Sequence, residues 1–232
     1  PNNSRTKDIK RSTRVARDAV VAMNALLAKH TEKDGSARPD ATRTPFPAEV
    51  LKKLSADELD ELAEARLGFA EADILFGRVH AAYQSAIWLQ ANPAHAKTFD
   101  RLWRSATIFQ RLGRYREAAR NVIDALTFPE ANTYDIQHAA ALILAQAGQR
   151  EECALTIQNA MKFPEAQNFN ALLQYADLLE KCEKKNAAVQ AINLALPLAT
   201  TAQPSGILAA ADLLLKIDST TYAPHVLSRL LQ

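Results

Sequence analysis

The residues best suited to metal binding are dispersed along this sequence. Five histidines fall in separate predicted elements, and none has a second ligand at the spacing that a zinc site requires: His30, His80, His95, His138 and His225. The two cysteines, Cys153 and Cys182, form neither a metal motif nor a disulfide framework. We therefore predict no metal centre and no cofactor.

Paired carboxylates are the remaining groups that could perform acid–base chemistry. Asp57 with Glu58, and Asp60 with Glu61, stand at the start of a predicted helix, where negative charge is favoured by the helix dipole. The six glycines are scattered, so neither G-x-G-x-x-G nor G-x-S-x-G is present. These features give no reason to predict an enzyme.

A repeated motif organises the sequence between about residues 63 and 199. Glycines recur at intervals of 36 and 35 residues, each followed five residues later by a small residue and sixteen later by proline: Gly77, Gly113 and Gly148; Ala82, Ala118 and Cys153; Pro93, Pro129 and Pro164. A fourth, degenerate copy has Glu183, Ala188 and Ala199 at these positions. Such a period predicts an all-α chain of about four stacked helical hairpins.

One copy illustrates the prediction. Apolar residues recur at helical spacing over residues 100–112 and again over residues 114–128. Gly113 is expected to end the first helix, because glycine readily adopts the left-handed turn conformation. Pro129 is expected to stop the second helix, because it lacks an N–H donor and clashes with the preceding turn.

The repeats resemble the tetratricopeptide repeat (TPR) superfamily. The resemblance rests on small residues in the first helix (Ala70, Ala106, Ala141, Ala176) and in the second (Ala82, Ala118, Cys153, Ala188), and on the stretches LFGRVHAAYQSAIWLQANP, RLGRYREAARNVIDALTFP and QAGQREECALTIQNAMKFP. It covers roughly 60% of the chain, and because the family period is 34 residues, each copy here carries a slight insertion near the proline. The resemblance implies an α-solenoid of antiparallel hairpins, and the alanine-rich repeats suggest a bacterial member.

The array is predicted to have flanking segments, so that the chain divides into residues 1–47, 48–199 and 200–232. The first contains a basic amphipathic helix over residues 8–30 and a Pro-rich linker. The helix has an apolar stripe made of Ile9, Thr13, Ala16, Val20, Met23 and Leu27, which would pack on its own domain, a partner or a membrane surface.

Local signals place further helices at both ends of the array. Ser55 and Glu58 have the spacing of a capping box, which predicts a helix start. Beyond the fourth copy, residues 207–217 and 222–231 are predicted to form helices that cap or extend the array.

The resemblance implies a function in protein recognition, because the first helices of TPR repeats line a concave groove that holds a peptide. Carrying those positions over by the repeat register gives Trp103, Arg104, Thr107 and Arg111; Asp135, His138, Leu142 and Gln146; and Asn170, Gln174, Asp177 and Lys181. Trp103 and Thr107 occupy positions where co-chaperone members carry a carboxylate clamp, so that clamp is absent. The implied role is a non-enzymatic adaptor, scaffold or assembly factor, of the kind that serves bacterial secretion, envelope or export machinery; homo-oligomers are permitted.

A face of the second copy is the most specific candidate. Arg104 and Arg111 are seven residues apart on one helix, and Trp103 adjoins them. Arginine beside tryptophan is favoured at binding hot spots, so we expect an acidic or C-terminal segment of a partner here. Reversing both arginines to glutamate is expected to weaken binding without affecting stability.

Two other functions remain open from the sequence. Basic segments 5–17 and 97–120 could bind nucleic acid, although the net charge is only +2 and no RNA- or DNA-reading motif is present. The chain could also be a regulatory domain of a larger enzyme or transporter. No apolar run reaches the ~18 residues of a membrane span, and no signal peptide is visible, so a cytoplasmic location is expected, or a periplasmic one if an upstream signal has been removed.

Overall fold

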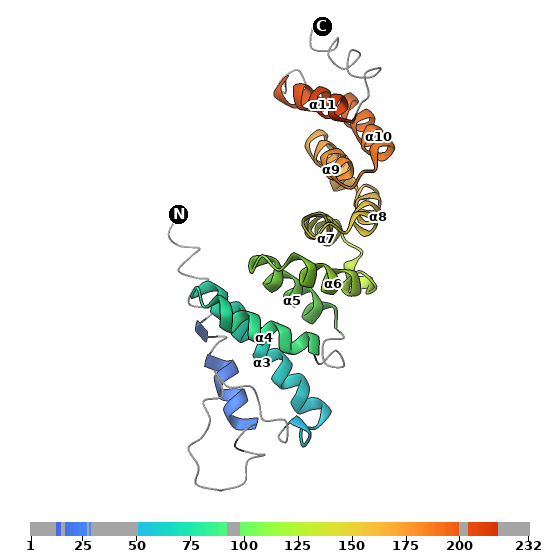
Figure 1. The fold of residues 1–232 in the computed structure, drawn as a ribbon. Helices are drawn as coiled ribbons and strands as arrows, with labels where there is room; N and C mark the ends of the chain where they lie inside the picture. The colour runs from blue at the N-terminus through green and yellow to red at the C-terminus, as the bar shows by residue number, and fades with distance from the viewer. Residues whose placement is uncertain are drawn as a thin grey trace. The chain divides into compact units, whose positions relative to one another are not determined.

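The computed structural model describes residues 13–14, 17–26, 28, 51–91, 98–199 and 204–217. Throughout these residues the regular secondary structure is helical, which confirms the predicted all-α class. The chain divides into two compact units, Pro1–Ala125 and Leu126–Gln232, which we describe separately. Figure 1 shows the helices of each unit.

The first unit contains two helical hairpins. They are formed by α3 (Ala56–Leu75) with α4 (Val79–Ala91), and by α5 (Phe99–Arg111) with α6 (Tyr115–Ala125). Helix α5 also packs against α3 and α4. The predicted capping box opens α3: the Glu58 backbone N–H donates to Ser55 Oγ at 3.3 Å, and the Ser55 N–H donates to Glu58 Oε2 at 2.8 Å.

The second unit continues the same scheme. Its hairpins are α7 (Tyr134–Gln146) with α8 (Arg150–Ala160), and α9 (Phe169–Lys181) with α10 (Lys185–Ala195). Helix α11 (Pro204–Lys216) packs on α9. It begins at Pro204, slightly earlier than the predicted start of the helix over residues 207–217.

Left-handed backbone at the hairpin turns explains the recurrent glycines. Gly77, Gly113 and Gly148 have φ of 72°, 70° and 72°. An added Cβ would meet nothing within 4 Å at any of them, so the requirement is conformational rather than a lack of space. Glu183 has φ 60° at the equivalent turn of the fourth copy, so this turn geometry persists without glycine.

The prolines have a different role from the predicted one. Helices α6 and α8 end at Ala125 and Ala160, before Pro129 and Pro164 are reached. Each proline occupies the first position of a short 3-10 helix, η2 (Pro129–Ala131) or η3 (Pro164–Ala166). A missing N–H costs little there, because the first N–H groups of a helix have no intrahelical partner. The expectation that Pro129 stops the second helix is therefore wrong.

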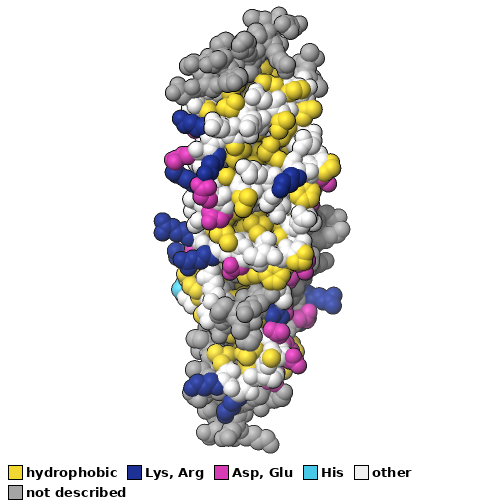
Figure 2. Space-filling view, turned by 90° about the vertical axis from the view of Figure 1, so that its right-hand side faces the viewer, with side chains coloured by type: hydrophobic (Ala, Val, Ile, Leu, Met, Phe, Trp, Pro, Cys, Tyr) yellow, Lys and Arg dark blue, Asp and Glu magenta, His cyan; other side chains and the backbone are white. Residues whose placement is uncertain are grey.

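Small residues at the hairpin contacts are buried, as the repeat pattern predicts. Ala106 and Ala118, on α5 and α6, are both fully buried. Ala141 and Cys153 occupy the same positions in the next hairpin and are also fully buried. On the molecular face drawn in Figure 2, hydrophobic side chains lie among acidic and basic ones.

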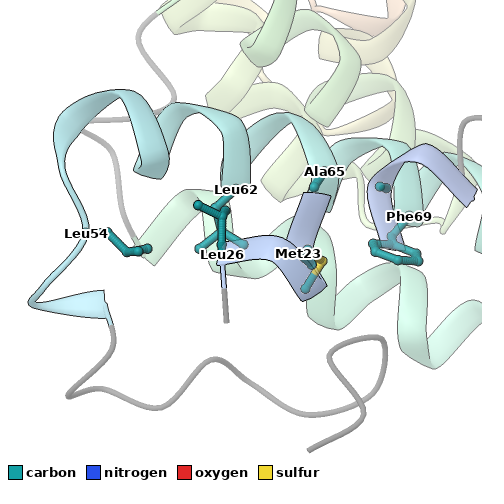
Figure 3. Packing of buried hydrophobic residues seen from close by; sticks show 7 residues of the cluster. Met23, Leu26, Leu54, Leu62, Ala65 and Phe69 are labelled. Atoms are coloured by element: carbon teal, nitrogen blue, oxygen red, sulfur yellow. The ribbon is translucent and has the colours of Figure 1, made fainter. Parts of the chain in front are cut away.

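The N-terminal segment is helical over residues 17–26. Three buried residues of this segment, Ala19, Met23 and Leu26, belong to one apolar cluster with Leu62, Ala65 and Phe69 of α3, most of which is drawn in Figure 3. Thr13, which was predicted on the apolar stripe, is exposed. The Pro-rich linker that was predicted to follow the helix within residues 1–47 lies outside the described residues, as does the C-terminal segment 222–231. The three-part division of the chain remains a prediction.

Candidate protein-binding groove

An open hollow of about 390 Å³ lies between α9 and α11 in the second unit. The two helices lie side by side in Figure 1. The hollow is lined by Asn170, Leu173, Gln174, Asp177, Ala209, Asp212, Leu213 and Lys216. We call this hollow the α9–α11 groove. It combines two leucines with two carboxylates, two amides and one ammonium group.

Close packing at one glycine holds α11 against α9. A Cβ on Gly206 would overlap the side-chain ring of Phe169, which is itself 4% exposed. Further along α11, Ala210 and Ala211 are buried. Ala211 follows Ala176 by 35 residues, the interval that also separates Ala141 from Ala176. Helix α11 therefore takes the place of a first helix in a further copy of the repeat.

The charged residues of α9 and α11 follow the same interval. Asp177 and Lys181 of α9 recur 35 residues later as Asp212 and Lys216 of α11. Lys181 Nζ lies 2.6 Å from Asp177 Oδ2, and Asp212 and Lys216 are both exposed. Each helix thus presents one carboxylate and one ammonium group in the same order.

Three residues predicted from the fourth copy lie together in the groove: Asn170, Gln174 and Asp177. Lys181 does not line the hollow but pairs with Asp177. Leu173 of α9 and the four lining residues that α11 supplies were not predicted from the sequence. The signal that could have revealed the α11 residues is the 35-residue interval to Ala211, because it continues the series of small residues into α11.

His138 of the third copy belongs to an aromatic cluster. Its Nδ1 lies 2.9 Å from the Tyr175 hydroxyl, and its ring stacks on Tyr134 at a centroid distance of 5.7 Å. Burial, together with hydrogen bonding to Tyr134, raises the pKa of Tyr175 above its ordinary value. The half-buried His138 therefore has one ring nitrogen engaged inside the protein, whereas Gln146, near the end of α7, is exposed.

The predicted hot spot of the second copy lies on α5 in the first unit. The Trp103 ring is half-buried and stacks on Phe99 at a centroid distance of 6.0 Å. The Thr107 hydroxyl donates to the Trp103 carbonyl at 3.0 Å. Arg111 is exposed. Of these predicted contact residues, Arg111 and part of the Trp103 ring are accessible to a partner.

Arg104 is engaged within the protein. Its Nε donates to Glu71 Oε1 at 2.7 Å, and its Nη1 donates to Glu64 Oε2 at 2.8 Å. Arg101 also binds Glu64, with a distance of 2.6 Å from Nε to Oε1. Burial alone would raise the pKa of Glu64, but hydrogen bonds from the two arginines outweigh it and hold that pKa below its ordinary value.

These ion pairs correct one expectation from the sequence. Arg104 was expected to bind a partner, and its reversal was expected to leave stability unchanged. Its guanidinium is instead held by carboxylates of α3, and burial, which would lower its pKa, is outweighed by hydrogen bonds and charges from Glu71 and Glu64, which raise it. Reversing Arg104 would therefore place a carboxylate beside these two.

Comparison with known proteins identifies the fold. No protein-family model matches the chain, and no curated protein matches it in sequence. Among solved structures, it is similar to MamA 41-end from Desulfovibrio magneticus RS-1, a bacterial TPR-containing protein, with a TM-score of 0.50. The match covers 73% of this chain and 93% of the MamA chain at 12% identity. The fold is TPR-like.

In the TPR-like frame, the candidate residues lie on the first helices of successive copies. Those helices are α5 in the first unit and α7, α9 and α11 in the second. Across the described segments, no helix is both long and apolar enough to cross a membrane. The same segments contain no group of three or more His, Cys, Asp or Glu side chains arranged to hold a metal ion.

Proposed function

We propose that this protein is a non-enzymatic adaptor that binds a segment of a partner protein in the α9–α11 groove. The proposal rests on the hollow itself, which two successive first helices line with apolar, amide and charged groups. The TPR-like fold supports a scaffold or assembly role, because it presents such helices side by side. The cytoplasm is the proposed location, with the periplasm as the alternative.

The groove's side chains favour a particular kind of segment. Leu173 and Leu213 offer apolar contacts, and the amides of Asn170 and Gln174 can donate to and accept from the partner's main chain. Asp212 has no ion-pair partner among the described residues, whereas Asp177 is neutralised by Lys181. We therefore propose a segment with an apolar side chain followed by a basic one, which would pair with Asp212.

A random peptide library displayed on phage tests this proposal. Peptides enriched on the full chain should share an apolar residue and a Lys or Arg, and they should bind at least about tenfold more weakly to Asp212→Arg, because that change reverses the local charge. Glu165→Arg makes the same change in charge at an exposed position outside the groove and is the matched control. Peptides that bind Asp212→Arg and the wild type equally would rule out the α9–α11 groove as the binding site.

Nucleic-acid binding gains no support from the structure. Arg101 and Arg104 lie in the basic segment 97–120, and both are neutralised by carboxylates of α3. Two of the cations that would have contacted phosphates are thus already paired.

A further inference from the structure

Arg66 of α3 is buried and has no counter-ion among the described residues. Arg66 is only 7% exposed, and its Nε and Nη2 atoms have no hydrogen-bond partner in the described part of the chain. Its guanidinium carbon lies 5.9 Å from the centroid of the Trp88 ring. No carboxylate in the described part of the chain forms an ion pair with Arg66, whereas Arg78, in the same unit, binds Asp73 at 2.6 Å.

Such an arrangement is unfavourable in the folded state. A buried guanidinium that lacks a counter-ion, and hydrogen bonds at two of its three nitrogens, loses hydration without full compensation. Burial accordingly lowers the pKa of Arg66. An apolar residue of similar volume would be buried here at a lower cost in free energy. The guanidinium would be stabilised by an anion, which the described residues do not supply.

The surroundings of Arg66 indicate where that anion would come from. Leu62, Ala65 and Phe69 flank it on α3, and the N-terminal helical segment 17–26 packs on them, as Figure 3 shows. Trp88, which faces the Arg66 guanidinium, packs against the same cluster. The contact between α3 and segment 17–26 therefore lies next to Arg66.

Segment 17–26 supplies apolar side chains to this contact but no carboxylate. Its one acidic residue, Asp18, has a side chain that is 68% exposed and pairs with Arg14 at 3.8 Å. Val21, on the outer side, is 63% exposed. Segment 17–26 thus covers the apolar face of α3 but supplies no carboxylate to Arg66.

We propose that segment 17–26 covers a binding site for an amphipathic helix of a partner protein, and that a carboxylate on that helix pairs with Arg66 when it replaces the cover. The partner helix would present an apolar stripe to Leu62, Ala65 and Phe69 and one Asp or Glu beside it. This surface belongs to the first unit and is independent of the α9–α11 groove, so each proposal can be tested without the other.

A pair of peptides tests this proposal on the full chain. One peptide has the sequence of residues 13–28, and the other is identical except for Ala22→Glu, at a half-buried position beside the apolar stripe. The chain has two tryptophans, so Trp103→Phe leaves Trp88 as the fluorescence reporter of binding. We expect the Glu-containing peptide to bind at least about tenfold more tightly than its control, and Arg66→Met to remove that difference.

Two further measurements separate this proposal from a structural role. Arg66→Met should raise the melting temperature of the full chain by about 2 °C or more, because it removes an unpaired buried charge. Met23→Ser should weaken the cover and so tighten binding of the Glu-containing peptide. A lower melting temperature for Arg66→Met would show that Arg66 already has an internal partner and would overturn the proposal. Equal affinity for the two peptides, or an affinity unaffected by Met23→Ser, would overturn it as well.

Discussion

The ring of Phe169 occupies the space that a side chain at Gly206 would need. This contact joins the first turn of α9 to the first turn of α11, and the α9–α11 groove lies between the same two helices. The groove therefore depends on a position at which only hydrogen fits.

Gly206→Ala should lower the free energy of unfolding by about 1–3 kcal/mol, because the added methyl group overpacks the contact with a buried ring. Urea denaturation followed by circular dichroism measures the change. Ser205→Ala, at the preceding exposed position, is the control and should have little effect. Adding Phe169→Leu to Gly206→Ala should restore part of the lost stability. If Gly206→Ala is as stable as the control, the close contact between Gly206 and Phe169 is absent.

At the fourth hairpin turn, Glu183 allows a substitution that should stabilise the protein. Because it holds φ 60°, Glu183→Gly should raise the free energy of unfolding by about 0.5–1 kcal/mol, since glycine adopts this region without steric strain. The change also removes an ion pair with Arg150, but both side chains are more than half exposed, so the pair contributes little. Thermal unfolding measures the gain.

The reciprocal change at an equivalent turn controls for this effect. Gly113→Ala should destabilise the protein by about 1 kcal/mol, although the methyl group meets no neighbouring atom within 4 Å. A loss of stability for Glu183→Gly, or none for Gly113→Ala, would contradict a conformational origin of the repeated glycines.

Charge reversal should distinguish Arg104 from Arg111, both on α5, by its effect on stability. Arg104→Glu should destabilise the protein by about 1–3 kcal/mol, because it breaks hydrogen-bonded ion pairs and adds a carboxylate beside Glu64 and Glu71. Arg111→Glu, at an exposed position, should change stability by less than about 0.5 kcal/mol. Equal melting temperatures for the two variants would argue against the ion-pair network.

The same network predicts a pH dependence. The pKa of Glu64 in the folded protein lies below its ordinary value of 4.5, so its ion pairs add stability above that pH. The contribution is lost as the pH falls through the folded-state pKa, because Glu64 then takes up a proton. The melting temperature of Glu64→Gln should therefore be lower than that of the wild type at pH 7 and close to it near pH 2. Glu165→Gln, at an exposed position, should track the wild type at both; a Glu64→Gln deficit that persists at low pH would exclude this linkage.

The hairpins could be predicted because their signals are local. The left-handed turn at Gly113 and the capping box of Ser55 and Glu58 each involve residues a few positions apart, and both are present in the structure. The small residues Ala106 and Ala118 repeat at a fixed interval, which made their burial predictable. Where the same packing requirement recurs in every copy of the repeat, the spacing of residues in the sequence is sufficient to predict it.

The side-chain partners could not be predicted in this way. Arg104 pairs with Glu71 and Glu64, which are 33 and 40 residues away, and nothing in the local sequence distinguishes such an arginine from a solvated one. Pro129 was predicted to stop a helix because proline lacks an N–H donor and clashes with the preceding helical turn. The first turn of a new helix tolerates it equally well, and only the structure distinguishes the two.

The repetition of Asp177 and Lys181 as Asp212 and Lys216 gives a ligand two alignments with the same order of charges, of which the one on α11 is favoured because Asp177 is already paired with Lys181. A segment that pairs with the charges of one helix would meet the same charges, in the same order, on the next. It could therefore step from one alignment to the other while still bound. A partner carrying two copies of the recognised segment on a short linker would fill both alignments at once, and its affinity would exceed that of either copy because the second contact forms at high effective concentration.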